Sequence, residues 1–369
     1  MTTPRSWAWR QRLLRLSRSI RHRLGGPKTV YVTARRSEYR GYWEAAARAL
    51  GAEFVPLTDD VWEIRRAGRA TRVSSWVTQC DDPVILRLAG DKAYSYRLAQ
   101  EAGVPVPRHA VATAADLSPG YRLLEELGRS VVVKPLKGSA SGQGVTTHVR
   151  DRAALERAAL LASLYHPEIL VEEMVPAESC RLLFLDGRLL HAVRRRGLRV
   201  TGDGRSTIES LLGRAGHPGP ASDVAVLDTL AAQGLALGAV PEAGVEVVAR
   251  GVPLAERDFE ELRTVYDEDV TERVAPGLAA ELARIVRGLG SEFAGVDIMT
   301  NDPGKPLSAN GGTFLEINTT PGLHHHYVSV SDPTRGPAVA VLAYLLETHA
   351  TSVSSPGGGA DSSMGRADV

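Results

Sequence analysis

Three polar side chains stand inside two otherwise apolar segments near the C-terminus. Asp297 lies in AGVDIMT, and Glu316 and Asn318 lie in TFLEINTTPGL. In an extended strand, residues two positions apart face the same side, so Glu316 and Asn318 are predicted to point together while Ile317 packs behind them. Carboxylate and amide oxygens are ligands that suit Mg2+. The spacing predicts a magnesium–nucleotide site, and the alternative is a sheet-edge strand with chance polar positions.

A second chemical pattern is the segment SVVVKPLKGSASGQGV at 130–145, in which an apolar strand ends in Lys134. Glycines let backbone N–H groups close around phosphate oxygens, and serine hydroxyls add donors. It is not a Walker A loop, because no G-K-[ST] sequence closes it and a strand rather than a helix is expected next. Together with Lys134 and the metal pattern, it predicts phosphate binding. The predicted phosphate-binding residues are Gly138, Ser139, Ser141, Gly142 and Gly144.

Lysine is rare in this chain, which has 44 lysine and arginine residues in all. The lysines are Lys28, Lys92, Lys134, Lys137 and Lys305. In an arginine-rich chain, a lysine indicates a position that needs the compact charge of an ammonium group rather than the planar guanidinium group of arginine. Three of the five fall in the segments predicted to bind phosphate.

Seven segments in order resemble the ATP-grasp superfamily, and within it the carboxylate–amine ligases. The likeness is strongest to the ATP-grasp half of cyanophycin synthetases and more distant to D-alanine–D-alanine ligases and glutathione synthetases. It covers about 230 residues, from 91 to about 325. The segments are DKAYSYRLAQEAGVPVP, VVVKPLKGSASGQGV, ILVEEMVPAESCRLLFLDGRLLHAV, VTGDGRSTI, DVTERVAP, FAGVDIMTNDPGKPLSANGG and FLEINTTPGL.

The resemblance implies a role for each motif. Lys92 and Lys134 would contact the phosphates of ATP, and the 138–144 loop would cap them as a mobile lid. The three oxygen ligands would bind two Mg2+ ions that bridge the β- and γ-phosphates. The implied adenine contacts are Glu172, Glu173 and the backbone near Met174 and Val175. The alternative for the two glutamates is a solvated strand end.

Three features depart from the family pattern. Ser179 stands where an acid usually binds the ribose, and Glu178 is the expected substitute. The stretch ARGVPLAERDFEELRTVYDE at 249–268 replaces the usual acceptor-pocket sequence, so the resemblance does not identify the substrates. His324, His325 and His326 follow TPGL. We favour a pocket rim for these histidines over a general base or a metal ligand, since Mg2+ prefers oxygen.

These residues together predict an ADP-forming ligase. A substrate carboxylate would attack the γ-phosphate, and an amine would displace phosphate from the acyl phosphate. The backbone around Thr320 and Gly322 is the family-like oxyanion donor. The candidates for anchoring a phosphate or carboxylate are Arg181, Arg194 and Arg250. The alternatives are an ATP-grasp-like kinase without an amine acceptor and a non-catalytic nucleotide-binding protein.

The helices and strands predicted to position these residues indicate an α/β chain with a β-rich lid. We expect strands at 29–34, 52–57, 74–77 and 84–89, with helices between them. A hairpin is expected to turn at Asp186-Gly187, and helices are expected near 207–214, 223–238, 277–289 and 337–349. The predicted organisation is a basic leader (1–27), an α/β pre-ATP-grasp lobe (28–90), an ATP-grasp domain (91–350) with a lid at about 112–176 and a C-terminal α+β lobe, and a disordered tail (351–369).

Composition excludes several classes of protein. The 369 residues are 43% hydrophobic and 24% charged, and no run of about 18 apolar residues exists to span a membrane. The leader 1–27 contains seven arginines and no acid, which leaves the rest of the chain acidic and argues against nucleic-acid binding. Cys80 and Cys180, which lack a C-x-x-C spacing, argue against both a disulfide scaffold and a zinc site, and a reducing cytoplasm is expected. The expected partners are small-molecule carboxylates and amines, in particular amino acids; a homodimer is left open.

Overall fold

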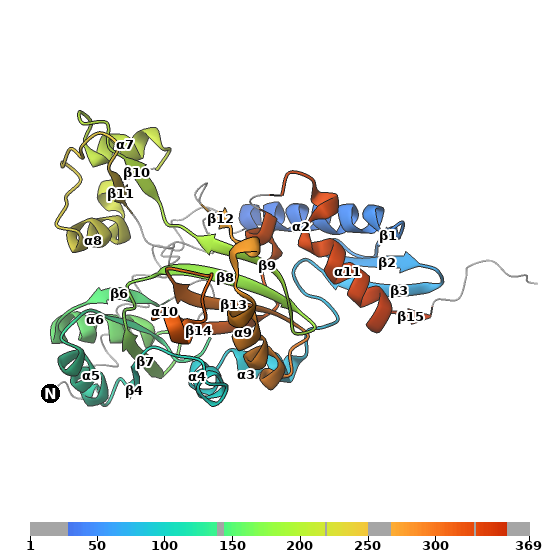
Figure 1. Ribbon diagram of the computed structural model, residues 1–369, viewed down its shortest axis with the longest axis horizontal. Helices are drawn as coiled ribbons and strands as arrows, with labels where there is room; N and C mark the ends of the chain where they lie inside the picture. The colour runs from blue at the N-terminus through green and yellow to red at the C-terminus, as the bar shows by residue number, and fades with distance from the viewer. Residues whose placement is uncertain (1–28, 139–143, 218–219, 250–266, 328–329, 353–369) are drawn as a thin grey trace, which may run out of the picture.

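The computed structural model describes residues 29–138, 144–217, 220–249, 267–327 and 330–352. Its described part combines four antiparallel sheets with helices, which confirms the predicted mixed α/β class. Figure 1 shows one central sheet with a small α/β unit at each end and a third unit above it. None of the helices within these ranges is long and apolar enough to cross a membrane.

The central sheet has the strand order β12-β9-β8-β13-β14. Its strands are β8 (Glu178–Leu185), β9 (Arg188–Arg195), β12 (Glu268–Asp269), β13 (Phe293–Thr300) and β14 (Thr313–Thr319). The predicted hairpin is confirmed, because β8 and β9 are joined through Asp186-Gly187, both at positive φ. One face packs against α3 (Pro83–Ala89), α4 (Lys92–Glu101) and α9 (Pro276–Leu289) in the largest core.

Alternation along the strands gives the central sheet two chemically different faces. Leu182, Val296 and Ile317 lie on the face covered by the helices. The residues between them face the other way: Arg181 stands opposite Asp297, which in turn stands opposite Glu316. The sheet therefore places Arg181, Asp297 and Glu316 together on the face away from these helices.

A second sheet lies at one end of the central sheet and has the order β4-β7-β5-β6. Its strands are β4 (His109–Thr113), β5 (Val131–Pro135), β6 (Thr146–Val149) and β7 (Glu168–Glu173). The helices α5 (Ser118–Leu127) and α6 (Arg152–Ala162) pack on it and form a separate core. This unit occupies the sequence range predicted for the lid.

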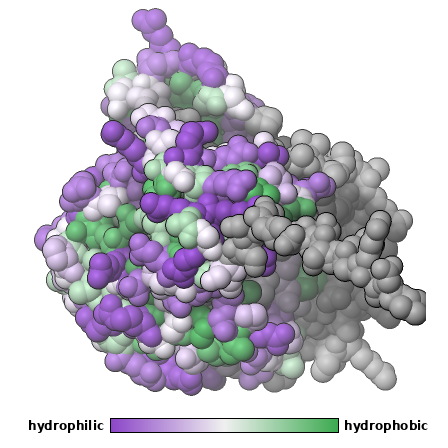
Figure 2. Space-filling model, turned by 90° about the vertical axis from the view of Figure 1, so that its right-hand side faces the viewer, coloured by the Kyte–Doolittle hydropathy of each residue, from purple (hydrophilic) through white to green (hydrophobic). Residues whose placement is uncertain are grey.

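The N-terminal sheet has the order β1-β2-β3-β15. Its strands are β1 (Glu53–Pro56), β2 (Val61–Arg66), β3 (Arg69–Ser74) and β15 (Thr351–Ser352). The helices α2 (Thr29–Ala49) and α11 (Pro337–Thr348) share its core with Leu183 and Phe293 of the central sheet. Figure 2 views this end of the molecule, where hydrophilic and hydrophobic residues alternate in small patches over the coloured surface.

The third small unit around the central sheet and several short helices complete the described fold. The unit contains β10 (Arg199–Thr201), β11 (Glu246–Val248), α7 (Ile208–Arg214), η1 (Pro220–Ser222) and α8 (Val224–Ala232). The remaining short helices are η2 (Thr271–Arg273), α10 (Leu307–Asn310), η3 (Leu323–Tyr327) and η4 (Pro333–Arg335).

Three predicted strands are wrong. Residues 29–34 begin the helix α2, and residues 84–89 lie in the helix α3. Asp82 caps α3 by accepting hydrogen bonds from the backbone of Val84 and Ile85, and Pro83 pre-sets its first turn. Residues 74–77 form a turn closed by an isolated bridge rather than a strand. Runs of Val, Ile and Leu favour strands only weakly, and here caps and neighbouring helix formers decide.

The end of the chain also differs from the prediction. Thr351 and Ser352, placed at the start of a disordered tail, pair with β3 as β15. The leader 1–27 and the rest of the predicted tail lie outside the described residues. The domain boundaries themselves stay predictions.

Candidate functional site

The structure brings the three predicted metal ligands together. Asp297 on β13 stands opposite Glu316 on β14, and Asn318 follows two residues later on the same face. The Asn318 Nδ2 lies 3.4 Å from Asp297 Oδ2 and 3.3 Å from Glu316 Oε1. A half-turn of this amide would present its carbonyl oxygen to the same point. The set offers only hard oxygen donors once that oxygen faces inward.

The electrostatics of this triad favour a cation. Burial raises the pKa of Glu316, and the neighbouring Asp297 charge raises it further. Burial also opposes ionisation of Asp297, but the Arg181 guanidinium holds the pKa of that carboxyl below its usual range. Arg181 donates from Nε to Asp297 Oδ1 at 2.7 Å and from Nη2 to Oδ2 at 2.5 Å. Two buried carboxylates that repel one another fit a divalent cation, so the residues present suit Mg2+.

Two buried lysines flank the triad from other elements. Burial lowers the pKa of Lys92, at the start of α4, and the charge of Glu316 opposes that effect. Lys134 at the end of β5 is only 7% exposed and pairs with Glu172 Oε1 at 2.7 Å. These positive charges lie where the sequence predicts phosphate binding.

Tyr96 completes this cluster, and the sequence reasoning missed it. Its hydroxyl donates to Glu172 Oε2 at 2.6 Å and accepts from Lys134 Nζ at 3.3 Å. Tyr96 follows Lys92 by one helical turn, so the i, i+4 spacing in DKAYSY was the signal available. Glu172 therefore holds Lys134 and Tyr96 in this structure, rather than facing solvent at a strand end.

The other residues predicted to hold the adenine take part in interactions within the protein. Glu173 pairs with Arg129, and the backbone N–H of Met174 donates to Ser130 at 3.3 Å. The Val175 carbonyl accepts from Ala177 at 2.9 Å.

Gly138 and Gly144 border the predicted phosphate loop, both at positive φ. A side chain on Gly144 would come within 2.6 Å of Tyr165, so this position requires glycine. Ser139, Ser141 and Gly142 lie outside the described residues.

The three candidate arginines do not share one position. Arg181 faces the triad, whereas the strand register places Arg194 on the opposite face, beside Cys180. Arg194 pairs with Glu178 at 3.1 Å, and its Nε and Nη2 are buried without a partner among the described residues. Arg250 lies outside the described residues. Arg195, which the sequence reasoning missed, faces the triad, and its charge lowers the pKa of Asp297.

Glu178, the proposed ribose contact, is held by three guanidinium groups. They belong to Arg194, Arg196 and Arg199, at 3.1, 3.5 and 3.3 Å. Any ribose hydroxyl would have to share this carboxylate with them.

The backbone after Asn318 is tightly constrained. A side chain on Gly322 would come within 2.7 Å of the His324 ring, so only glycine fits there. Thr320 has a φ of 38°, and its N–H donates to Asp81 Oδ1 at 3.2 Å. The amide predicted to bind an oxyanion therefore already has an acceptor from the N-terminal lobe.

The structure buries all three consecutive histidines, which disagrees with a position at an exposed rim. His324 Nδ1 bonds the hydroxyl of Tyr39 at 3.0 Å. His326 Nδ1 lies 3.1 Å from His191 Nδ1, and His191 Nε2 lies 3.2 Å from Asp269 Oδ2. The register of β9 and β12 puts His191 and Asp269 on the same face as Arg181.

The hydrogen bonds that join Asp269, His191 and His326 determine the tautomers of the two imidazoles. A carboxylate only accepts, so His191 carries its proton on Nε2 and accepts at Nδ1 from His326. His326 Nε2 is then a bare lone pair, buried and without a partner among the described residues. Burial, with the nearby imidazoles and Arg181, holds the pKa of His326 well below its usual range. The imidazole of His326 is therefore neutral at neutral pH.

Comparison with known proteins finds similar curated proteins, although no family model matches. It is 30% identical over 270 residues to a cyanophycin synthetase of Geminocystis herdmanii, covering 71% of this chain and 30% of that protein. It is 26% identical over 298 residues to the glutathione biosynthesis bifunctional protein of Streptococcus mutans, covering 75% of this chain and 38% of that protein.

Among solved structures, a bifunctional glutathione synthetase from Pasteurella multocida matches with a TM-score of 0.52 and 19% identity. The match covers 82% of this chain and 43% of that one. This likeness shows the fold. The chain spans about a third of the length of the curated relatives that it matches.

Proposed function

The chain belongs to the ATP-grasp superfamily, and on this basis we propose that it is an ATP-dependent, ADP-forming ligase that joins a carboxylate to an amine. The observation that carries the proposal is the partly buried group of Asp297, Glu316 and Asn318, with Lys92 close enough for its charge to act on Glu316. Oxygen ligands beside lysines suit the polyphosphate of a nucleotide and its magnesium.

Each residue of the site has a part in the first step. Mg2+ on the three oxygen ligands would neutralise the charge of the β- and γ-phosphates during transfer. Lys92 and Lys134 bind the phosphates, and Glu172 orients Lys134. Arg181 donates to Asp297 through Nε and Nη2, so it keeps this ligand ionised and adds positive charge beside the phosphates. The substrate carboxylate attacks the γ-phosphate, which yields an acyl phosphate and ADP.

His326 serves the second step. The acceptor amine must lose a proton as it attacks the acyl phosphate, and His326 Nε2 is an acceptor held in one tautomer by His191 and Asp269. The amine nitrogen forms the new bond to the carbonyl carbon, phosphate leaves, and the proton passes to Nε2. The partly exposed Asp269 offers the far end of the chain as an outlet for that proton.

We propose amino acids or small peptides as the two substrates. Arg181 and Arg195 on the face of the triad support this, since guanidinium groups recognise carboxylates. The relatives named above include enzymes of cyanophycin and glutathione synthesis. The product would be either an α-linked dipeptide or a side-chain-linked amide of the γ-glutamyl type, and the experiment must distinguish the two.

A phosphate-release screen with Mg–ATP and pairs of amino acids tests the proposal, with mass spectrometry of the products. We expect ADP, phosphate and an amide that needs both co-substrates. Hydroxylamine should trap the activated donor as a hydroxamate without the amine. A stable phosphoester with no amide would instead indicate a kinase, and nucleotide binding without turnover a non-catalytic protein. AMP and pyrophosphate would contradict attack at the γ-phosphate.

A further inference from the structure

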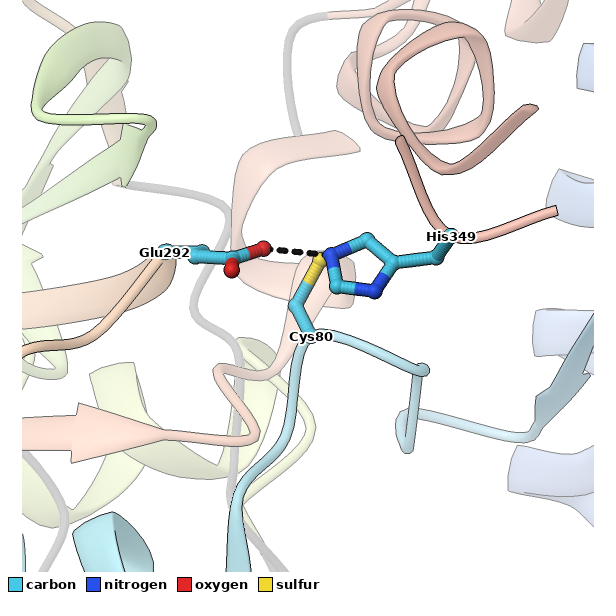
Figure 3. Close-up of side chains that lie close together, drawn as sticks. All are labelled: Cys80, Glu292 and His349. Carbon is cyan, nitrogen blue, oxygen red and sulfur yellow. Dashed lines mark hydrogen bonds and ion pairs between the residues drawn. The ribbon is translucent and has the colours of Figure 1, made fainter. Parts of the chain in front are cut away.

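A thiol, an imidazole and a carboxylate from three distant segments converge outside the nucleotide site. Cys80 precedes α3, Glu292 precedes β13, and His349 follows α11. Figure 3 shows their side chains pointing toward one another. One donor atom from each lies within 4.8 Å of the other two.

The three groups already interact, and they remain accessible. His349 Nε2 lies 2.5 Å from Glu292 Oε2, and the Tyr344 hydroxyl donates to the same oxygen at 3.2 Å. The His349 and Glu292 side chains are 24% and 43% exposed. Cys80 is half-buried. An ion from solvent can therefore reach the cluster, and water can fill a remaining ligand position.

We propose that Cys80, Glu292 and His349 form a binding site for a divalent cation of the Zn2+ class. A soft sulfur with an imidazole and a carboxylate suits Zn2+ or Co2+ and disfavours Mg2+, which takes oxygen. Around a tetrahedral centre with bonds of about 2.0–2.3 Å, ligand atoms stand roughly 3.3–3.8 Å apart. The 2.5 Å contact between His349 and Glu292 is shorter than this spacing, and no pair of donor atoms is more than 4.8 Å apart, so small side-chain rotations suffice. Tyr344 would orient Glu292 from behind, as partners of metal ligands commonly do.

The position of the cluster gives the cation a structural role. It would tie the end of α11 and the turn before β13 to the segment 78–82. That segment contains Asp81, whose Oδ1 accepts from the Thr320 N–H and whose Oδ2 accepts from the Thr78 N–H at 2.6 Å. A bound ion would therefore brace the contact between the N-terminal lobe and the end of β14, the strand that carries Glu316 and Asn318.

Cobalt gives a sulfur-specific test that needs no enzymatic activity. Co2+ added to chelator-treated full-length protein should produce a thiolate-to-cobalt charge-transfer band in the near ultraviolet. Cys80→Ser should remove the band, and His349→Ala should weaken Co2+ binding at least about tenfold. Cys180→Ala is the matched control, because Cys180 is buried inside the central sheet and should not affect the band. Glu316→Gln controls for binding at the triad and should also retain it.

Zn2+ provides a second readout. It should raise the melting temperature of the wild type and of Cys180→Ala, but not that of Cys80→Ser, with Mg2+ present throughout to fill the triad. Circular dichroism confirms that each variant folds. Absence of the band in the wild type, its persistence in Cys80→Ser, or an equal Zn2+ effect on both cysteine variants would overturn the proposal.

Discussion

Glu316 shows at the level of one residue how a binding site opposes stability. Its carboxyl is buried beside Asp297, and this raises its pKa because two negative charges share a site with little water. A cation relieves that repulsion, whereas folding without one must bear it. The residue is therefore expected to favour function at some expense of stability.

Glu316→Gln separates the two effects. Turnover that depends on Mg2+ should fall at least about 100-fold, roughly 2.7 kcal/mol of barrier, because a metal-binding carboxylate becomes a neutral amide. In chelator, the melting temperature should stay the same or rise, because the repulsion with Asp297 is gone. Phosphate-release assays and thermal denaturation measure the two outcomes. The exposed Glu101→Gln is the control; near-normal turnover in Glu316→Gln would contradict the metal assignment.

Lys134 allows a second test at this scale. Lys134→Ala should weaken ATP binding or turnover at least about tenfold, about 1.4 kcal/mol, because one charge-assisted phosphate contact is lost. Lys305 is 62% exposed and pairs only with nearby Asp302 among the described residues, so Lys305→Ala should leave both unchanged. Nucleotide titrations by calorimetry measure the effect. If Lys134→Arg binds and turns over ATP as well as the wild type does, any cationic side chain suffices at this position.

At the scale of elements, strand alternation made part of the site predictable from the sequence. Glu316 and Asn318 are two residues apart in one strand, so their shared face follows from local geometry alone. Arg195 and His191 reach the same face through the pairing of β9 with β8, a register that depends on contacts across the sheet. Nothing near them in the sequence marks that register. The helix α3 was misjudged although its Asp82-Pro83 cap was visible.

The chain from Asp269 through His191 to His326 joins three elements, and it should affect only one chemical step. Asp269→Asn removes the group that fixes the tautomer of His191, and His326→Gln removes the acceptor itself. Both should lower amide formation at least about tenfold, the low end of general-base effects. Both should retain hydroxamate formation, because hydroxylamine is already unprotonated at neutral pH and the proton that it loses on forming the hydroxamate can pass to water. Equal loss of amide and hydroxamate would indicate a merely structural role.

The pairing of β2 with β3 sets a pH dependence away from the site. Hydrogen bonds from Arg65 at 2.8 Å and Arg72 at 2.9 Å hold the pKa of Glu63 below its ordinary 4.5 despite its burial. A depressed pKa gives stability that is present above pH 4.5 and is lost as pH falls through the folded value. Glu63→Gln should cost about 1 kcal/mol at pH 7. Urea titrations should show this difference shrinking below about pH 4.5, and a constant difference would contradict the assignment.

At the scale of the whole molecule, the N-terminal lobe is joined to the central sheet through a shared core. Tyr39 and Trp43 of α2 are fully buried in a core that also contains Leu183 and Phe293 of the central sheet. Tyr39 bonds His324, and Tyr42 stacks on Tyr327 at 3.8 Å between ring centroids. β15 adds the end of the described chain to the same lobe. Residues before position 50 therefore contribute directly to the support of the histidine segment.

Two truncations of the N-terminus should consequently behave in opposite ways. Removing residues 1–27 should leave folding and phosphate release intact, because the nucleotide, metal and core residues named above all lie beyond them. Removing residues 1–49 deletes Tyr39 and Trp43, and loss of a buried Trp alone typically costs about 3–5 kcal/mol. That is a large share of the roughly 5–15 kcal/mol that stabilises a domain, so the shorter chain should lose its cooperative melting transition and its turnover together. Circular dichroism melts and phosphate-release assays on both chains decide the matter. If the first truncation folds but no longer turns over ATP, the basic leader contributes to the active site, and the assignment of catalysis to the described sheet alone is wrong.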